Sequence, residues 1–521
     1  MNRILFICFA VLFISCNQAR NGISVTEGLF IENVTIITAD SNGIITAKVG
    51  NLILDGSTIV ALSDSTPDIT GNYKTIDGDG KYIIPGLIDS HVHLNNIAGI
   101  DFQQRASKTE LVNEYFERLP ENYLYYGYTT LIDVDNYAPK TIERLRNVSL
   151  GPEIYTCGKK VQVMNDFEMV MNELSTEEKL KQPFLYDKYN TNIKYPDSLN
   201  LSDHTPEVLI QEIVSEGNIC VKTLYEDASS GLPQVWELPS KAIMSELVNK
   251  AHEEGMCVIM HSPSYESQLF ALENEVDIIA HAMWNWTSDP EKFLDTNLPN
   301  THKDLLLEIA KKGIGYQPTF RTITGELEVL KDEFAENPEL LHLYSPSYLN
   351  YLKSQDAKWI KNRILNRPEF LGKINPDFFY PIRNKFESDE ELFDALYASY
   401  LTKIGIVVNL MAENDGNLLF ATDNGAMNMP THVPGLNGYL EMKHWIDAGV
   451  SLEQLLKAAT YNNAKTFNLL DSIGSIEVGK KANLLILNSN PLESISAYND
   501  IEIIINQGRV LNRTELSAQK N

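Results

Sequence analysis

Two histidines, His91 and His93, follow an apolar segment in the run PGLIDSHVHL, which covers residues 85–94. Side chains alternate between the two faces of a strand, so both imidazoles are expected to point to the same side. Two neutral imidazoles at the end of a strand provide half of a metal site. A single His-x-His pair is more often just two polar residues at a strand end, so the interpretation depends on the rest of the chain.

Four further side chains that can bind a cation or move a proton follow other apolar runs. Lys222 ends the run ICVK, His261 ends VIMH, His281 ends IIAH, and Asp423 ends LFATD. Taken singly, each has an ordinary alternative as a core histidine, a surface lysine or a helix-capping aspartate. Because the active residues of a closed parallel barrel project from the carboxyl ends of its strands, the joint pattern predicts one site at one rim.

The elements that would position these residues alternate between helix and strand through the middle of the chain. The apolar spacing predicts a helix over 240–254, a C-terminal glycine at Gly255 and a strand over 256–260. Strands are expected to begin near residues 85, 128, 153, 219, 256, 277, 314 and 418. Eight strands alternating with helices indicate an α/β fold, a (β/α)8 TIM-like barrel.

Both ends of the chain are rich in short β-type runs. Runs over 29–37 and 50–61 carry Asp-Gly turn chemistry, and further strands are expected over 483–487 and 501–505. We therefore expect a small β-sandwich built from the two terminal segments. The predicted division is a signal peptide 1–15, a tether 16–26, sandwich parts 27–84 and 469–515, and a metal-dependent barrel 85–468.

Two stretches of the barrel, about 159–206 and 321–407, are too long for simple connections. Long insertions in compact domains are either functional lids and subdomains or plain surface elaboration, and both alternatives stay open. Helical patches are expected over 326–334 and 389–401.

The net charge of −27 over 521 residues argues against nucleic acid as a partner and against electrostatic docking on anionic lipid. At 43% hydrophobic and 22% charged residues, the composition is that of a folded globular protein.

The N-terminus carries an export pattern, with Arg3 followed by an apolar run over 4–14 that is too short to span a bilayer. Ser15-Cys16 after it resembles a bacterial lipoprotein signal, with lipidation on Cys16, and the alternative is a secretory signal with an incidental cysteine. The mature protein is thus expected to be exported and membrane-anchored only by its lipid, facing the periplasm or the cell surface. No later stretch is expected to span a membrane.

The five cysteines do not suggest a disulfide framework. Cys8 leaves with the signal and Cys16 is capped, which leaves Cys157, Cys220 and Cys257. Cys220 and Cys257 lie in apolar strand patterns and are expected to be buried, inert thiols.

The motifs PGLIDSHVH, GYTTLIDV, VKTLYED, VIMHS, DIIAHA and LFATDN occur in that order, and the run IGSIEVGKKANL follows near the C-terminus. Together they resemble the amidohydrolase superfamily, in its imidazolonepropionase-like branch that includes exported metal-dependent dipeptidases. The resemblance covers about residues 29–510 except the two insertions. Asn483 stands where the family usually has Asp, a difference that concerns the sandwich and not the site.

The resemblance implies two divalent metal ions bridged by an N6-carboxylated Lys222. His91, His93 and Asp423 would bind the more buried ion, and His261 and His281 the other. A lysine in an apolar barrel mouth has a lowered pKa, so its neutral amine can add CO₂. Imidazole and carboxylate ligands suit zinc, although manganese and other ions stay open.

The expected reaction is cleavage of an amide-type C–N bond, in a dipeptide or a cyclic amide, by a metal-bridging hydroxide. Asp423 would take the hydroxide proton and pass it to the leaving nitrogen. Candidate substrate contacts are Tyr225, Gln317 and His432, each with the alternative of a packing or loop residue. Substrate identity and oligomeric state cannot be read from the sequence.

Two other functions stay open. A mononuclear deaminase on the same scaffold commonly carries an acid shortly after the fifth-strand histidine and lacks the fourth-strand lysine. Here Ser262-Pro263-Ser264 follows His261 and Lys222 is present, which favours the two-metal hydrolase. A lipoprotein that binds a ligand without catalysis is disfavoured because all six expected metal ligands are present.

Overall fold

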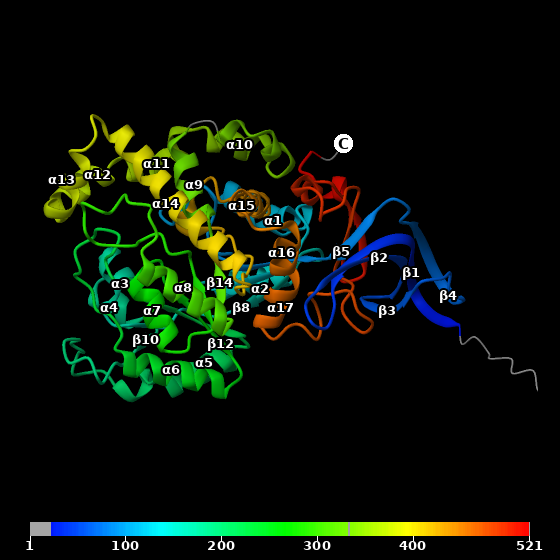
Figure 1. The fold of residues 1–521 in the computed structure, drawn as a ribbon, viewed down its shortest axis with the longest axis horizontal. Helices are drawn as coiled ribbons and strands as arrows, with labels where there is room; N and C mark the ends of the chain where they lie inside the picture. The colour runs from blue at the N-terminus through cyan, green and yellow to red at the C-terminus, as the bar shows by residue number, and fades with distance from the viewer. Residues whose placement is uncertain (1–21, 332–333, 520–521) are drawn as a thin grey trace, which may run out of the picture.

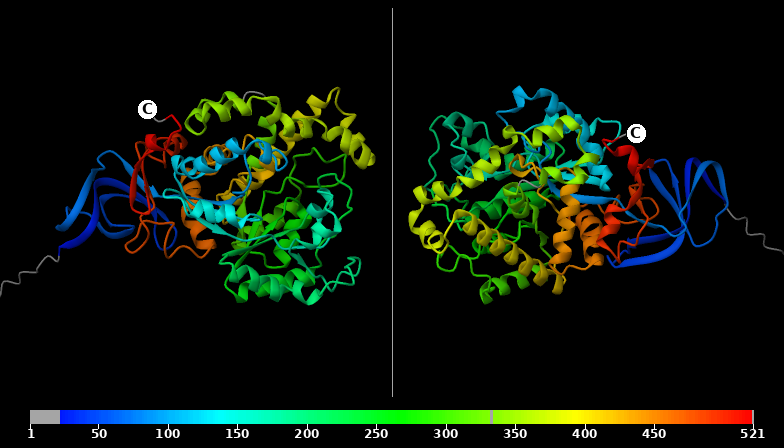
Figure 2. Two further views of the ribbon diagram at one scale, coloured as in Figure 1. Left: turned by 180° about the vertical axis from the view of Figure 1, so that it is seen from behind. Right: turned by 90° about the horizontal axis from the view of Figure 1, so that it is seen from above.

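The computed structural model describes residues 22–331 and 334–519 (Figure 1). The expected signal peptide, tether start and Cys16 lie outside these residues. A lobe of β-strands projects from one end of a larger body of helices and strands, and the C-terminal segment lies between the two (Figures 1 and 2).

The projecting lobe is one eight-stranded sheet made from both ends of the chain. Its order is β17-β16-β15-β5-β1-β2-β3, and β4 pairs with β1. The strands are β1 (Ile23–Ala39), β2 (Ile45–Asp55), β3 (Thr58–Ser63), β4 (Ile69–Asp77), β5 (Tyr82–Pro85), β15 (Leu484–Leu487), β16 (Ile501–Asn506) and β17 (Arg509–Asn512). The N- and C-terminal strands meet where β5 pairs antiparallel with β15. The domain boundaries themselves stay a prediction.

The expected hairpin is present where the chain turns at Asp55-Gly56. Asp55 pairs with Thr58 across the turn, and Gly56 has φ +54°, a conformation that glycine adopts without steric cost. Alternate strand residues such as Leu52, Ile83 and Ile486 are fully buried in the apolar core of this lobe.

The body contains seven parallel strands in two ladders. The first ladder is β6 (Leu87–Val92), β7 (Tyr128–Asp133) and β8 (Glu153–Thr156); the second is β11 (Cys220–Leu224), β12 (Cys257–His261), β13 (Ile278–Ala280) and β14 (Gly315–Gln317). The helices that accompany them are α1 (Thr109–Tyr125), α2 (Pro139–Arg146), α5 (Pro206–Ser215), α6 (Lys241–Glu253), α7 (Tyr265–Glu273), α8 (Asn300–Lys312), α15 (Leu436–Asp447), α16 (Leu452–Lys457) and α17 (Asn463–Thr466). The prediction of seven strands at these positions is confirmed.

Helix α6 shows how the local sequence sets these elements. Its N-cap Ser240 accepts a hydrogen bond from the Ile243 amide, which satisfies a donor that the helix leaves free. Ile243, Leu247 and Ala251 form its buried stripe, as the spacing predicts.

The eighth predicted strand, near residue 418, is not a regular strand in the structure. Residues 418–424 make only isolated parallel bridges, Tyr316 with Leu418 and Val92 with Asn424. The carbonyl of Phe420 accepts from the backbone amide of Ser90, and the Ser90 hydroxyl and the Asn463 side-chain amide donate to it as well. The segment nevertheless runs between β14 and β6.

Backbone hydrogen bonds also link the two ladders on their other side. The Ile219 amide donates to the carbonyl of Thr156, and the Val161 amide donates to the carbonyl of Lys222, at 2.9 and 2.8 Å. The carboxyl ends of β6, β11, β12 and β13 and the 418–424 segment therefore lie near one another.

The two insertions contain short elements of their own. The first holds β9 (Gln162–Val163), β10 (Phe184–Leu185), α3 (Phe167–Met171) and α4 (Thr176–Leu180). The second holds α9 (Arg321–Leu330), α10 (Pro346–Leu352), α11 (Trp359–Leu365), α12 (Arg367–Ile374), α13 (Pro376–Arg383) and α14 (Asp389–Glu413). Helices α12 and α13 form an outer corner of the molecule (Figure 1).

Helix α14 corrects the expectation that no later stretch is long and apolar enough to span a membrane. Its 25 residues meet that criterion by length and composition. In the structure α14 packs against α8 and α9, and Ile404, Val407 and Val408 are fully buried in the body.

The expectation for the cysteines is wrong in one respect. Cys157 and Cys220 form a disulfide between the end of β8 and the start of β11. The spacing gave no sign of it because the partners are 63 residues apart, and only the parallel pairing of the two segments brings them together. Cys257 is a buried free thiol, as expected.

Candidate metal centre

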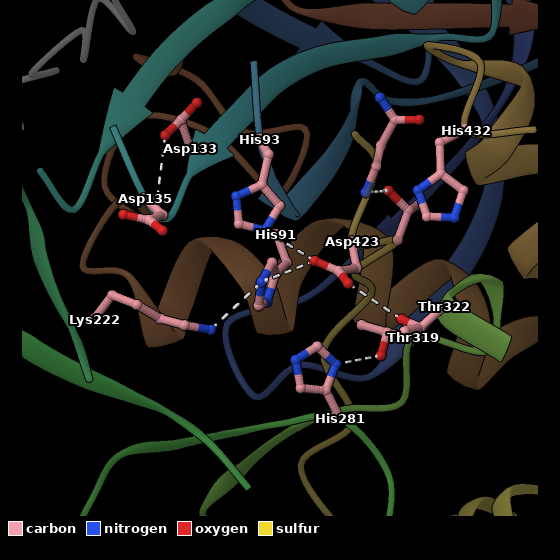
Figure 3. A network of polar contacts seen from close by, with 12 residues as sticks. His91, His93, Asp133, Asp135, Lys222, His281, Thr319, Thr322, Asp423 and His432 are labelled. Atoms are coloured by element: carbon pink, nitrogen blue, oxygen red, sulfur yellow. Dashed lines mark hydrogen bonds and ion pairs between the residues drawn. The ribbon is translucent and has the colours of Figure 1, made fainter. Parts of the chain in front are cut away.

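Three of the predicted ligands form one compact group. Side-chain donor atoms of His91, His93 and Asp423 lie within 4.8 Å of one another. Oδ1 of Asp423 is 3.0 Å from Nε2 of His93 and 3.3 Å from Nε2 of His91 (Figure 3). Two imidazoles and a carboxylate at this spacing are a donor set that suits a divalent cation.

Lys222 enters the same group from β11. Its Nζ lies 3.4 Å from Nε2 of His91, and the residue is buried (Figure 3). Burial lowers the pKa of Lys222 to about 8, and this outweighs the opposing influence of Asp423 and Asp135. A neutral amine is therefore accessible near neutral pH at this position.

His281 and His261 complete the cluster of predicted metal ligands; His281 lies next to His91, and His261 lies next to His281. The ring centroids of His281 and His91 are 5.4 Å apart, and those of His261 and His281 are 4.6 Å apart. Nδ1 of His281 hydrogen-bonds Oγ1 of Thr319 at 2.8 Å, which leaves Nε2 of His281 for another partner. All six predicted ligands thus gather in one place.

The charge state of the group follows from its contacts. Burial alone would raise the pKa of Asp423, but the hydrogen bond with His93 and the neighbouring imidazoles hold it well below its usual range. Burial lowers the pKa of His91 and of His281 far below the usual histidine value. At His93 burial is outweighed by the hydrogen bond and charge of Asp423, which raise the pKa of that imidazole, so a cation bound there would displace a proton.

Three residues of the site have left-handed backbone conformations. The φ angles are +55° for Asp423, +77° for His281 and +51° for Thr319. A positive φ is costly for a β-branched residue such as Thr319, and such conformations are found mainly where a functional site requires one side-chain orientation. In Thr319 this conformation places the hydroxyl in hydrogen-bond contact with His281.

The comparisons with known proteins agree on one family. The Amidohydrolase family model matches residues 399–512, which include Asp423. L-hydantoinase of Paenarthrobacter aurescens is 22% identical over 473 residues, 88% of this chain and 85% of the relative. Together with the sequence motifs, these similarities support the amidohydrolase superfamily.

Solved structures of similar fold extend along nearly the whole chain. A Xaa-Pro dipeptidase with methionine bound in its active site matches with a TM-score of 0.57 and 18% identity, covering 93% of this chain and all of that one. Molinate hydrolase matches with a TM-score of 0.60 and 18% identity, covering 94% and 95%. At this identity the likeness concerns the fold alone, and these neighbours imply a TIM-barrel-like α/β fold with a β-sandwich. Within residues 22–331 and 334–519, the strands of the body form separate parallel ladders and no closed barrel. The family model and the L-hydantoinase relative together support a metal-dependent hydrolase of carbon–nitrogen bonds.

Asp89 is a structural residue of this amidohydrolase that sequence reasoning passed over. Its carboxylate accepts hydrogen bonds from the amide and hydroxyl of Thr422, at 3.1 and 2.7 Å, next to Asp423. Burial raises the pKa of Asp89 to about 7. Its position two residues before His91, on the same strand face, was the available signal.

Gln317, predicted as a substrate contact, is fully buried and has both ends of its amide occupied. Its Oε1 lies 2.9 Å from Nδ1 of His91, and its Nε2 donates to the carbonyl and hydroxyl of Ser90. Because an amide oxygen only accepts, Nδ1 of His91 carries the hydrogen and Nε2 is free to bind a cation. The structure therefore gives Gln317 an orienting contact with His91 rather than a free face for substrate.

The other two predicted substrate contacts differ in access. His432 is fully buried, its Nε2 lies 3.1 Å from the carbonyl of Arg321, and burial lowers its pKa to about 4. Tyr225 is half-buried and lies against the ring of Phe270. Of the three candidates, Tyr225 is the one with solvent-accessible surface beyond the cluster, and its role stays a prediction.

Two further residues touch the predicted ligands. Thr322, in the second insertion, donates to Oδ2 of Asp423 at 3.2 Å (Figure 3). Glu226 accepts from Nε2 of His261 at 3.2 Å. Neither carried a signal in the sequence, because both lie in irregular or inserted segments whose path depends on the tertiary fold.

The predicted ligands provide donor atoms for one cation on the His93–Asp423 side of His91 and for another on the His261–His281 side. His91 and His281 each have Nδ1 tied to a neutral side chain, and Nε2 of His91 faces two other predicted ligands, Lys222 and Asp423. Oε1 of Glu226 is buried without a hydrogen-bond partner among the described residues. An orphaned carboxylate oxygen beside free imidazole nitrogens is an arrangement that a bound cation satisfies.

Proposed function

We propose that this amidohydrolase cleaves an amide-type C–N bond of a small substrate, a dipeptide or a cyclic amide, with two divalent cations. The observation that carries the proposal is the convergence of Lys222 and Asp423 on His91, within 3.4 Å, in a buried cluster. A hydantoinase and a Xaa-Pro dipeptidase among the similar proteins support these two substrate types. The three- and four-stranded ladders, joined through the 418–424 segment, support a single closed ring of eight segments beneath the site.

In this proposal His91, His93 and Asp423 hold one ion, and His261 and His281 hold the other. Lys222, N6-carboxylated, supplies a carboxylate between them. Zinc is the proposed ion because imidazole nitrogens dominate the donor set. The lowered pKa of Lys222 supports carboxylation, since the neutral amine is the form that adds CO₂.

Bound at this position, a pair of cations lowers the pKa of a shared water and polarises a substrate carbonyl. The protein contributes the rest of the chemistry. Asp423 Oδ1 lies on the imidazole side, and Thr322 holds Oδ2, so the carboxylate is fixed to accept a proton and return it to the leaving nitrogen. Burial of His91, Lys222 and His281 excludes bulk water and strengthens these interactions.

The test combines metal analysis with a substrate screen on the full-length protein. Two zinc ions per chain, hydrolysis of a dipeptide or a hydantoin-type cyclic amide, and loss of both after chelation are the expected results. A metal-free protein after incubation with excess zinc, or no turnover of amides with both ions bound, would contradict the proposal. Lys222→Ala is expected to bind less zinc than the wild type. Bicarbonate, as a source of CO₂ for the lysine, is expected to increase zinc binding by the wild type but not by this variant.

A mononuclear deaminase remains the second candidate because an acid does lie beside the fifth-strand histidine. That acid is Glu226, which reaches His261 from the loop after β11. The position of Lys222 against His91 favours the two-metal hydrolase. One ion per chain with release of ammonia from an aminated heterocycle would support the deaminase instead.

We also propose that the protein is exported and anchored through a lipid on Cys16, which lies outside the described residues. The buried Cys157–Cys220 disulfide supports export, since disulfides form and persist in oxidising compartments. Globomycin-sensitive processing and palmitate labelling of the full chain, both abolished in Cys16→Ala, are the expected results. Labelling that persists in Cys16→Ala would contradict the lipid assignment.

A further inference from the structure

The carboxylate of Glu226 lies against His261 and is buried. Its Oε2 is 3.2 Å from Nε2 of His261, and only 7% of its side chain is exposed. The other oxygen, Oε1, has no hydrogen-bond partner among the described residues. A buried carboxylate with one unpaired oxygen is costly unless a positive group completes its surroundings.

Two contacts fix Glu226 in this position. The indole Nε1 of Trp236 donates to the backbone carbonyl of Glu226 at 2.5 Å, and the Trp236 ring packs edge-to-face on Phe167 at 4.9 Å. On the other side, the amide of Tyr225 donates to the backbone carbonyl of His261 at 3.2 Å. The carboxylate is therefore held beside the imidazole by backbone anchors and does not depend on a bound cation to reach it.

The contact determines which nitrogen of His261 is free. A carboxylate only accepts hydrogen bonds, so in the neutral ring Nε2 carries the hydrogen and Nδ1 keeps its lone pair. His91 and His281 are paired in the opposite sense, through Nδ1, so that Nε2 carries the lone pair; in His91 this nitrogen faces Lys222 and Asp423. Each of these three histidines is thus oriented by a different polar side chain: Gln317, Thr319 or Glu226.

The three orienting groups differ in charge. Gln317 and Thr319 are neutral, whereas Glu226 adds a negative charge on the His261 side alone. Hydrogen bonding to a carboxylate also makes an imidazole a stronger donor to a metal ion. Among the described residues, Glu226 is the carboxylate in contact with His261, whereas Asp423 contacts His91 and His93.

We propose that Glu226 is a positioning residue that fixes His261 with Nδ1 free and gives the His261–His281 cation a negative charge in addition to that of the Lys222 carboxylate. The inference rests on the proposed two-cation function. It makes the second cation dependent on Glu226 and the first cation, at His91, His93 and Asp423, independent of it.

The experiment measures zinc binding to the full chain by equilibrium dialysis, with the wild type, Glu226→Gln and Glu226→Ala. The wild type is expected to bind two ions. Glu226→Ala is expected to keep the tighter ion and to bind the second about 10–100-fold more weakly, the usual cost of losing such a partner. Glu226→Gln, which can still accept the hydrogen of Nε2 but lacks the charge, is expected to recover part of the loss.

Glu266→Gln is the matched control, because Glu266 is a nearby carboxylate with no contact to a predicted ligand among the described residues. It is expected to bind two ions with wild-type affinity. Should Glu226→Ala fail to fold, nitrogen chemical shifts of histidine-labelled wild-type protein without metal test the same point. The shift of a protonated Nε2 and an unprotonated Nδ1 in His261, against the reverse in His91, is expected.

The outcomes separate the inference from the proposed function. Two ions bound by Glu226→Ala at wild-type affinity, or a protonated Nδ1 in His261, would overturn the role of Glu226 and leave the two-cation hydrolase intact. A wild type that binds only one ion would overturn both.

Discussion

Asp423 Oδ1 lies 3.0 Å from Nε2 of His93, although 330 residues separate the two in the chain. The contact joins the end of β6 to the irregular 418–424 segment. The other carboxylate oxygen of Asp423, Oδ2, accepts a hydrogen bond from Thr322 of α9. The carboxylate of Asp423 therefore contacts both His93 and the second insertion. The insertion is therefore part of the structure that orients Asp423.

Replacement of Asp423 by Asn is expected to reduce amide hydrolysis by about 10²–10⁴-fold, the usual contribution of a positioned acid–base group. The amide keeps the size of the carboxylate but accepts no proton at neutral pH. Steady-state hydrolysis measured alongside zinc content checks this. Near wild-type turnover with both ions bound would rule out the proton-transfer role.

Gln317→Leu separates an orienting role from a substrate-binding role. The structure predicts a loss of zinc affinity of about 10–100-fold, because Nδ1 of His91 loses its acceptor and the ring its fixed orientation. The Michaelis constant of fully zinc-loaded enzyme is expected to stay near its wild-type value. A raised Michaelis constant with unchanged zinc affinity would instead support the substrate contact expected from the sequence.

Loss of the Cys157–Cys220 disulfide is expected to lower the free energy of unfolding by about 2–4 kcal/mol. The cross-link closes a long loop and so restricts the unfolded chain. Urea unfolding of the double variant Cys157→Ser, Cys220→Ser measures the change. Cys257→Ser, at the buried free thiol, is the control, and equal stabilities of the double variant and wild type would contradict the prediction.

The His444 imidazole predicts a specific acid sensitivity. Burial, with help from Arg321, lowers the pKa of His444 to about 4 in the folded state, below the value near 6.5 of the unfolded chain. The unfolded state then binds the proton more readily, so stability present above pH 6.5 is lost as the pH falls toward 4.

The expected loss from His444 between pH 7 and pH 5 is on the order of 1–2 kcal/mol. His444→Gln removes the titrating group but keeps a polar side chain beside Phe320, whose ring lies 5.7 Å from that of His444. Unfolding free energies of both proteins at the two pH values give the comparison. A pH dependence as steep in His444→Gln as in the wild type would show that other groups account for it.

The six candidate ligands could be found from the sequence because each ends an apolar run, a local pattern that a strand imposes. Helix α6 and the hairpin at Asp55-Gly56 could be predicted for the same reason, because an N-cap serine and a turn glycine are local signals. In these cases the residues that decide the structure are neighbours in the chain.

The features that could not be predicted from the sequence depend on segments that contact one another only in the folded protein. The Cys157–Cys220 disulfide needs β8 to lie beside β11, and the contacts of Thr322 and Glu226 need the paths of an insertion and a loop. Gln317 was placed at the right strand end, but its role depends on Ser90 and His91 facing it from another ladder. The segment expected as a strand near residue 418 does hydrogen-bond to its neighbours through the backbone, but its bridges are isolated and do not form a regular ladder.

Strand β5 of the projecting sheet is completed by β15, with Tyr82 opposite Leu487. During synthesis, β5 can pair with β1 early, but its second neighbour exists only after residues 484–487 have been made. The apolar edge of β5 is exposed throughout that interval, and exposed strand edges favour aggregation. Nascent chains that end before β15 (Leu484–Leu487) are therefore expected to aggregate more readily than chains that include it.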